Sequence, residues 1–79
     1  MEAASIRSLI IDDDPFIRDL LQDKLSQYLP EVEVLTTASS GTEGLQKIAG
    51  YKPDLIFLDV EMGDMTGFEM LAQLEDIDF

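Results

Sequence analysis

Apolar residues occur along the chain in two alternating patterns, and the alternation predicts the order of its elements. Three short runs, residues 6–11, 31–36 and 54–58, have the length and apolar content of strands. After each run, apolar residues recur at helical spacing, over residues 15–29, 45–49 and 68–74. We therefore predict strand, helix, strand, helix, strand, helix, which is typical of an α/β fold with a parallel sheet and right-handed crossovers.

Local capping signals predict where the helices begin and end. Asp14-Pro15 is an N-cap followed by proline at the first helical position. Residues 40–43 and 66–69 each have the pattern of a capping box, with Ser or Thr followed three residues later by Glu. Pro30 should end the first helix and Gly50 the second. Among the aromatic residues we expect three in the core: Phe16, Phe57 and Phe68.

Acidic residues directly follow two of the predicted strands. Asp12 and Asp13 come after the first strand, and Asp59 comes after the third. The second strand begins with strict apolar–polar alternation, which indicates a half-exposed edge strand and favours the order 2-1-3. In such sheets, ligands bind outside the carboxyl ends of the strands, where the strand order reverses. We therefore expect Asp12, Asp13 and Asp59 to lie together at that end of the sheet.

Two explanations compete for the acidic run Asp12-Asp13-Asp14. Acids before a helix satisfy its free N–H groups, which explains Asp14 and one more of the run. Capping does not explain why the third strand also ends in Asp59, so we favour a functional cluster. Three neighbouring carboxylates repel one another unless a cation lies among them. Ligands that offer only oxygen favour Mg²⁺ or Ca²⁺ over softer metals, and the absence of an EF-hand loop from the sequence favours Mg²⁺ over Ca²⁺. A carboxylate beside Mg²⁺ can attack phosphorus.

Composition removes several classes of function. The 79 residues include no Cys and no His, which excludes disulfides, thiolate metal sites and histidine-based catalysis within this sequence. The formal charge of −12 argues against a surface for nucleic acid or anionic membrane. The sequence shows neither a basic leader with an apolar core nor a run long enough to cross a membrane, so we expect a cytoplasmic protein.

Three segments, taken in order, resemble the CheY-like receiver domain of bacterial response regulators: Leu9–Pro15, Pro53–Met62 and Thr66–Glu69. The resemblance extends from about Ile6 onward and implies a flavodoxin-like open parallel sheet. It also implies a role in two-component signalling, in which Asp59 accepts a phosphoryl group from a sensor histidine kinase or a phosphotransfer protein. On this basis we predict a signalling module that is not an enzyme.

The resemblance further assigns roles to the acidic residues. Asp13 and Asp59 would ligate Mg²⁺ directly, and Asp12 would act mainly through a bound water. The backbone carbonyl of Glu61 would be a third protein ligand. Gly67 matches the small residue that lets this loop pack closely before the third helix.

The sequence departs from the receiver pattern at two places. Gly63 stands where the family normally has proline. The chain also ends at Phe79, so the fourth and fifth strands, the switch Ser/Thr and the Lys that contacts the phosphoryl group have no counterpart here. We therefore expect residues 1–79 to be a single, partial receiver domain whose third strand leaves an open edge suited to self-association.

Two other functions are compatible with these residues. A degenerate receiver would act as a non-phosphorylated interaction module, as the absent Lys and Ser/Thr suggest. A Mg²⁺-dependent phosphatase with an aspartyl nucleophile would carry a second Asp two residues after the nucleophile, but that position is Glu61. The intact acidic cluster favours the phospho-accepting receiver over both.

Overall fold

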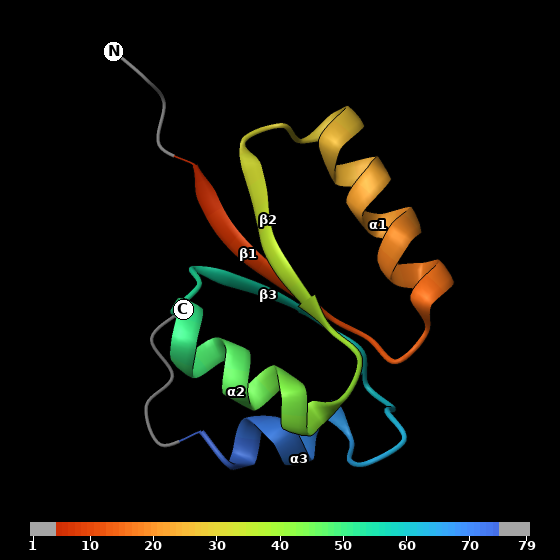
Figure 1. Cartoon of the computed structure of the whole chain (residues 1–79), viewed down its shortest axis with the longest axis vertical. Coiled ribbons are helices and arrows are strands. Elements are labelled where there is room, and N and C mark those ends of the chain that lie inside the picture. Colours follow the sequence, from red (N-terminus) through yellow and green to blue (C-terminus); the bar gives the residue numbers. More distant parts are fainter. Residues whose placement is uncertain (1–4, 75–79) are drawn as a thin grey trace.

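The computed structural model describes residues 5–74 as a three-stranded parallel sheet between helices (Figure 1). The element order is β1 (Ile6–Ile11), α1 (Pro15–Tyr28), β2 (Val32–Ala38), α2 (Gly41–Tyr51), β3 (Leu55–Leu58) and α3 (Gly67–Ala72). The strand order is β2-β1-β3, and β1 pairs in parallel with both neighbours. The predicted α/β class and the 2-1-3 order are confirmed.

The central strand β1 carries most of the buried core. Its last four residues, Ser8 to Ile11, are all buried. Leu9 and Ile11 belong to one apolar cluster with residues from β2, α2 and α3 and from the loop before α3: Ala38, Ile48, Met62 and Met70. The buried hydroxyl of Ser8 donates to the backbone carbonyl of Glu33 at 2.9 Å, so this polar group is satisfied inside the sheet.

Helix α1 is covered far less than the rest of the fold. Leu25 is its one buried residue, although apolar side chains recur along the helix. Phe16 in α1 is 68% exposed and Phe68 in α3 is 71% exposed, so the expectation that both lie in the core is wrong. Phe57 in β3 is half-buried. Helical spacing identifies the apolar side of a helix, but it does not show whether another element lies against that side.

Two of the three predicted helix starts have the expected geometry. The Asp14 carboxylate accepts from the Phe16 backbone N–H at 2.9 Å, with Pro15 next to it at the first helical position. Thr66 and Glu69 form the complete capping box: each side chain accepts from the backbone N–H of the other residue. These caps depend on side chains within four residues of each other, which is why the sequence predicts them.

The ends of α2 differ from the prediction. The Ser40 hydroxyl accepts from the Glu43 N–H at 3.1 Å, but the Glu43 carboxylate accepts from Ser39 rather than Ser40, at 2.6 Å from its backbone N. The reciprocal bond of the predicted capping box is therefore displaced by one residue. The hydrogen bond from the Ser39 N–H is the main cause of a lowered pKa for Glu43.

The predicted stop at Gly50 is also wrong, because α2 continues to Tyr51 and Lys52 adopts the left-handed conformation with φ of 50°. The guanidinium of Arg7 donates to the carbonyls of Tyr51 and Lys52, at 2.6 and 2.8 Å. A side chain from β1 thus satisfies the last carbonyls of α2, and no signal near Gly50 in the sequence indicates it. Within residues 5–74, no helix combines the length and apolarity that a membrane crossing requires.

Candidate functional site

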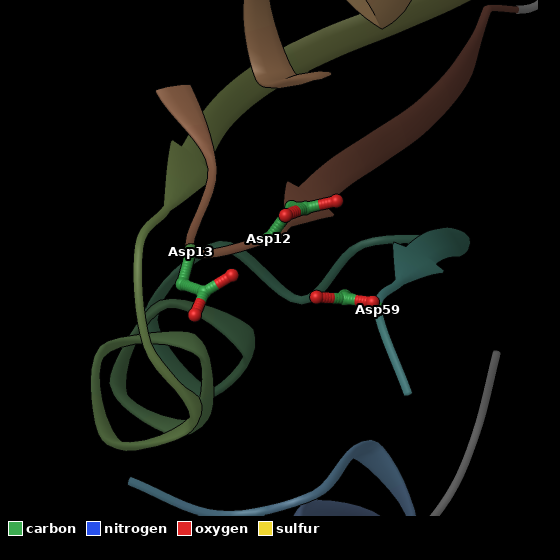
Figure 2. A group of neighbouring side chains, drawn as sticks. All are labelled: Asp12, Asp13 and Asp59. Atoms are coloured by element: carbon green, nitrogen blue, oxygen red, sulfur yellow. The ribbon is translucent and has the colours of Figure 1, made fainter. Parts of the chain in front are cut away.

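The carboxylates of Asp12, Asp13 and Asp59 lie together where β1 and β3 end (Figure 2). One oxygen from each residue can be chosen so that all three lie within 4.8 Å of one another. Asp12 and Asp59 are half-buried and Asp13 is exposed. The structure therefore brings together the three acids that the sequence places after two separate strands, close enough that a cation could be held among them.

Backbone hydrogen bonds of the sheet hold these acids in place. The Asp12 N–H donates to the Ala38 carbonyl at the end of β2, at 3.0 Å. The Asp59 N–H donates to the Ile11 carbonyl at the end of β1, at 2.9 Å. Parallel pairing thus extends one residue past the ends of β1 and β3, and these residues are Asp12 and Asp59. The backbone positions of Asp12 and Asp59 relative to each other are consequently set by the sheet.

Asp12 has a second role in the turn that leads to α1. Its Oδ1 accepts from the Asp14 N–H at 2.9 Å, and its backbone carbonyl accepts from the Arg18 guanidinium at 2.7 Å. One carboxylate oxygen of Asp12 is therefore used in the turn. The auxiliary role of Asp12 beside Asp13 and Asp59 stays a prediction.

An open hollow of about 240 Å³ adjoins the acidic cluster on the α1 side of the sheet. Asp12 and Asp59 line it together with apolar side chains of β1, α1 and β3: Ile10, Leu21, Phe57 and Leu58. The acids thus lie between solvent and an apolar wall. Charges in such a position are screened less by water than fully exposed charges are.

The loop after Asp59 folds back on itself before α3. Glu61 and Thr66 form an antiparallel bridge, and the Met62 N–H donates to the Met65 carbonyl at 3.2 Å. The Gly67 N–H donates to the Val60 carbonyl at 2.7 Å. These bonds give a defined backbone conformation to Glu61, the residue predicted to offer a backbone carbonyl. Its role as a ligand stays a prediction.

Gly67 is required where this loop meets β3. A Cβ at position 67 would lie 2.6 Å from the carbonyl oxygen of Asp59 and 3.1 Å from the Leu58 side chain. Backbone cannot retreat from such a contact without moving Asp59 itself. The expectation that a small residue at this position permits close packing of the loop is thus consistent with the geometry.

Asp64 is a residue of this region that the sequence did not single out. Its carboxylate accepts from the backbone N–H groups of Gly41 and Thr42, both at 2.9 Å, and from the Thr42 hydroxyl at 2.8 Å. These hydrogen bonds, led by the one from Gly41, lower the pKa of Asp64 to about 2. The partners are 22 and 23 residues apart in the chain, so no local motif could have shown the contact.

A family model of the response regulator receiver domain matches residues 8–78. The chain belongs to the response regulator receiver family. This membership confirms the resemblance seen in the three sequence segments and places the chain among the receiver domains of two-component signalling.

Solved receiver domains share the fold. The response regulator domain of CheB from Thermotoga maritima is 37% identical, with a TM-score of 0.79 over 85% of this chain and 49% of that one. CheY of Borrelia burgdorferi, solved in a CheX–CheY–BeF3–Mg²⁺ complex, is 25% identical with a TM-score of 0.76, over 87% of this chain and 52% of that one. The present chain therefore spans about half the length of these receiver structures.

The curated relatives correct one prediction. A protein-glutamate methylesterase/protein-glutamine glutaminase of Methanospirillum hungatei is 48% identical over 92% of this chain. The expectation that the protein is not an enzyme is wrong in that light, because this relative and several others are named as enzymes. The chain spans 21% of the length of that relative, and what it matches there is the receiver region.

Proposed function

We propose that this chain is a phospho-accepting receiver module in which Asp59 takes a phosphoryl group in the presence of Mg²⁺. The observation that carries the proposal is the meeting of Asp12, Asp13 and Asp59 within 4.8 Å, at the carboxyl ends of β1 and β3. Family membership supports it. So does the structurally similar CheY of Borrelia burgdorferi, which was solved with BeF3 and Mg²⁺.

The donor set suits a hard divalent cation. The three clustered side chains offer only carboxylate oxygens, and such ligands favour Mg²⁺ over softer metals. Asp13 and Asp59 would hold the ion directly, Asp12 would hold it through water, and Glu61 would add its backbone carbonyl. When bound, Mg²⁺ offsets negative charge on the oxygens of the phosphoryl group.

The chemical step itself falls to Asp59. One of its carboxylate oxygens forms a bond to phosphorus while the bond between phosphorus and the donor nitrogen of a phosphohistidine breaks. The sheet contributes by fixing Asp59 through the hydrogen bond from its N–H to Ile11, so the nucleophile needs little reorganisation. The half-buried position of Asp59 limits the water that competes with the carboxylate for the phosphoryl group.

The proposal also covers the phosphoryl donor, the cellular compartment and the part of a receiver domain that these residues represent. The phosphoryl donor is a sensor histidine kinase or a phosphotransfer protein, and the setting is cytoplasmic. The 79 residues form the first three strand–helix units of a receiver domain, the part that contains the acidic cluster. Self-association through the free edge of β3 stays a prediction; within the described residues, that edge pairs with no further strand.

Intact mass spectrometry after treatment with acetyl phosphate tests this function. We expect a single phosphoryl adduct that needs Mg²⁺, disappears in Asp59→Asn and persists in Asp54→Asn. Asp54 is the matched control because it is an aspartate at the opposite end of β3, where its carboxylate accepts from the backbone N–H of Arg7 at 3.0 Å. Without the Lys of the family, the reaction should be slow and incomplete in this chain.

Two results would contradict the proposal. A Mg²⁺-dependent adduct that remains in Asp59→Asn would place the nucleophile elsewhere. A wild-type chain that binds Mg²⁺ at the cluster but forms no adduct, even with prolonged treatment, would favour an interaction module that is not phosphorylated.

A further inference from the structure

Asp64 links the loop after β3 to a helix that is distant in sequence. It lies at the tip of the turn closed by the Met62–Met65 hydrogen bond. From there its two carboxylate oxygens accept three hydrogen bonds from Gly41 and Thr42, at the first turn of α2. Each donor lies within 2.9 Å of the carboxylate, so the tip of the turn is fixed to α2 at two adjacent residues.

The neighbouring side chain strengthens the same contact. Met65 lies so close to Gly41 that a Cβ at position 41 would overlap the Met65 side chain. The loop therefore touches α2 with a polar group and an apolar group side by side. Between this contact and Asp59 lies Glu61, whose backbone carbonyl is the proposed third ligand. Both ends of the segment that carries this carbonyl are held, one by β3 and the other by α2.

Gly63 makes the attachment of this loop to α2 important. Glycine widens the range of conformations open to a loop, whereas the proline that the family normally has at this position restricts it. Gly63 does not use the positive φ that only glycine adopts easily. In the part of the chain that the structure describes, the recorded hydrogen bonds do not involve its N–H. The hydrogen bonds of Asp64 to α2 are a source of order for this loop that does not depend on residue 63.

We propose that Asp64 is a positioning residue that holds the Glu61 carbonyl at the right distance from Asp13 and Asp59 for a divalent cation. The inference rests on the proposed function and deepens it, because it names the residue that replaces the rigidity of the family's proline. Asp64 touches neither the ion nor the phosphoryl group. It acts through the turn, and through the bridge between Glu61 and Thr66.

A simpler role for Asp64 would be to cap α2 only. It would then stabilise the fold without changing the affinity for metal. Ser40 separates the two roles, because its hydroxyl also caps α2 by accepting from the Glu43 N–H at 3.1 Å but makes no recorded contact with the loop after β3. Ser40→Ala thus weakens the same end of the same helix and leaves the loop attached.

The test is titration of the full chain with Mg²⁺ alone, followed by calorimetry and by NMR of the backbone amides of residues 59–62. The set comprises the wild type, Asp64→Ala, Ser40→Ala, Gly63→Pro and the double variant Asp64→Ala/Gly63→Pro. Urea denaturation of each variant confirms that it is folded at the temperature of the titration.

We expect Asp64→Ala to weaken Mg²⁺ binding about tenfold, the lower end of what outer partners of metal ligands contribute. Ser40→Ala should stay within about twofold of the wild type, since it leaves the ligand-bearing loop untouched. Gly63→Pro should restore most of the affinity in the double variant, although it restores none of the hydrogen bonds of Asp64. That recovery would show that Asp64 supplies order to the loop.

The outcomes separate the two proposals. If the wild type binds Mg²⁺ and Asp64→Ala binds it equally well, or loses no more than Ser40→Ala, the positioning role is wrong and the proposed function stands. Failure of Gly63→Pro to recover affinity also overturns the positioning role. If the wild type shows no Mg²⁺ binding at residues 12, 13 and 59, the proposed function fails and the positioning role with it.

Discussion

The two faces of the sheet are covered to different extents, although apolar residues recur at helical spacing in the helices on both faces. On the face toward α2 and α3, Leu9, Ile11 and Met70 are each completely buried. On the other face, α1 contributes a single buried residue, Leu25, and leaves Ile17 and Leu20 about 40% exposed. Figure 1 shows α2 and α3 close together and α1 alone on its side. Helical spacing of apolar residues thus accompanies a packed face on one side of the sheet and a sparsely covered face on the other.

The functional site lies partly on the packed face of the sheet and partly on the sparsely covered face. The loop that carries Glu61 and Asp64 belongs to the packed face, where Met62 is in the core and Met65 packs against it. The hollow beside Asp12 and Asp59 belongs to the open face. The ligand positions are therefore held by well-packed elements, while the access side of the cluster adjoins the part of the fold with the least burial.

Matched leucine truncations should show the largest difference between the faces. Leu9→Ala should lower the free energy of unfolding by about 2–5 kcal/mol, because it leaves a cavity in a core with no exposure. Leu20→Ala, at a position 42% exposed, should lower it by less than about 1 kcal/mol. Urea denaturation followed by circular dichroism measures both. Equal losses would mean that α1 packs as firmly as α2 and α3.

Glycine substitutions should show a smaller effect at the boundary between β3 and the loop. Gly67→Ala should destabilise the fold by about 1–3 kcal/mol, because its Cβ would meet the Asp59 carbonyl at 2.6 Å. Gly63→Ala meets no atom within 4 Å and should raise stability slightly, by about 0.4–1 kcal/mol. Thermal unfolding of the two variants provides the measurement. A neutral Gly67→Ala would contradict the close contact at Asp59.

The smallest expected effect is a pH dependence of the contact between the loop and α2. The pKa of Asp64 is lowered from 3.8 to about 2 by hydrogen bonds that it accepts only in the folded chain. Its stabilising contribution is therefore complete above about pH 4 and is lost as the pH falls toward 2. The difference in urea midpoint between wild type and Asp64→Asn should shrink over that interval. A difference that stays constant there would show that the carboxylate does not titrate with folding.

Much of the fold follows from the sequence because its signals are local. The apolar runs ending at Ile11 and Leu58 predict two strands, and the acids after them predict a common edge. Asp14-Pro15 and the Thr66–Glu69 box predict helix starts, since the bonds that cap a helix join residues close in sequence. The acidic cluster could be predicted although its residues are far apart in sequence, because the predicted strand order brings the ends of β1 and β3 together.

The features that the sequence missed depend on contacts between distant segments. Asp64 meets Gly41 across 23 residues, and Arg7 caps the end of α2 across 44 and 45 residues. Neither contact leaves a periodic or short-range signal. The exposure of Phe16 and Phe68 was missed for a related reason, because burial of a helical apolar residue depends on which element lies opposite it.

The acidic net charge of the chain has a kinetic consequence. Three of the five, Arg7, Arg18 and Lys47, donate to backbone carbonyls, while the chain as a whole carries a formal charge of −12. An approaching anion therefore meets a repulsive field whose reach is about 10 Å at 0.1 M salt and longer in dilute buffer. Encounter with a free phosphorylated small molecule is slowest at low ionic strength. A donor with basic residues around its phosphoryl group would instead be attracted by the same field.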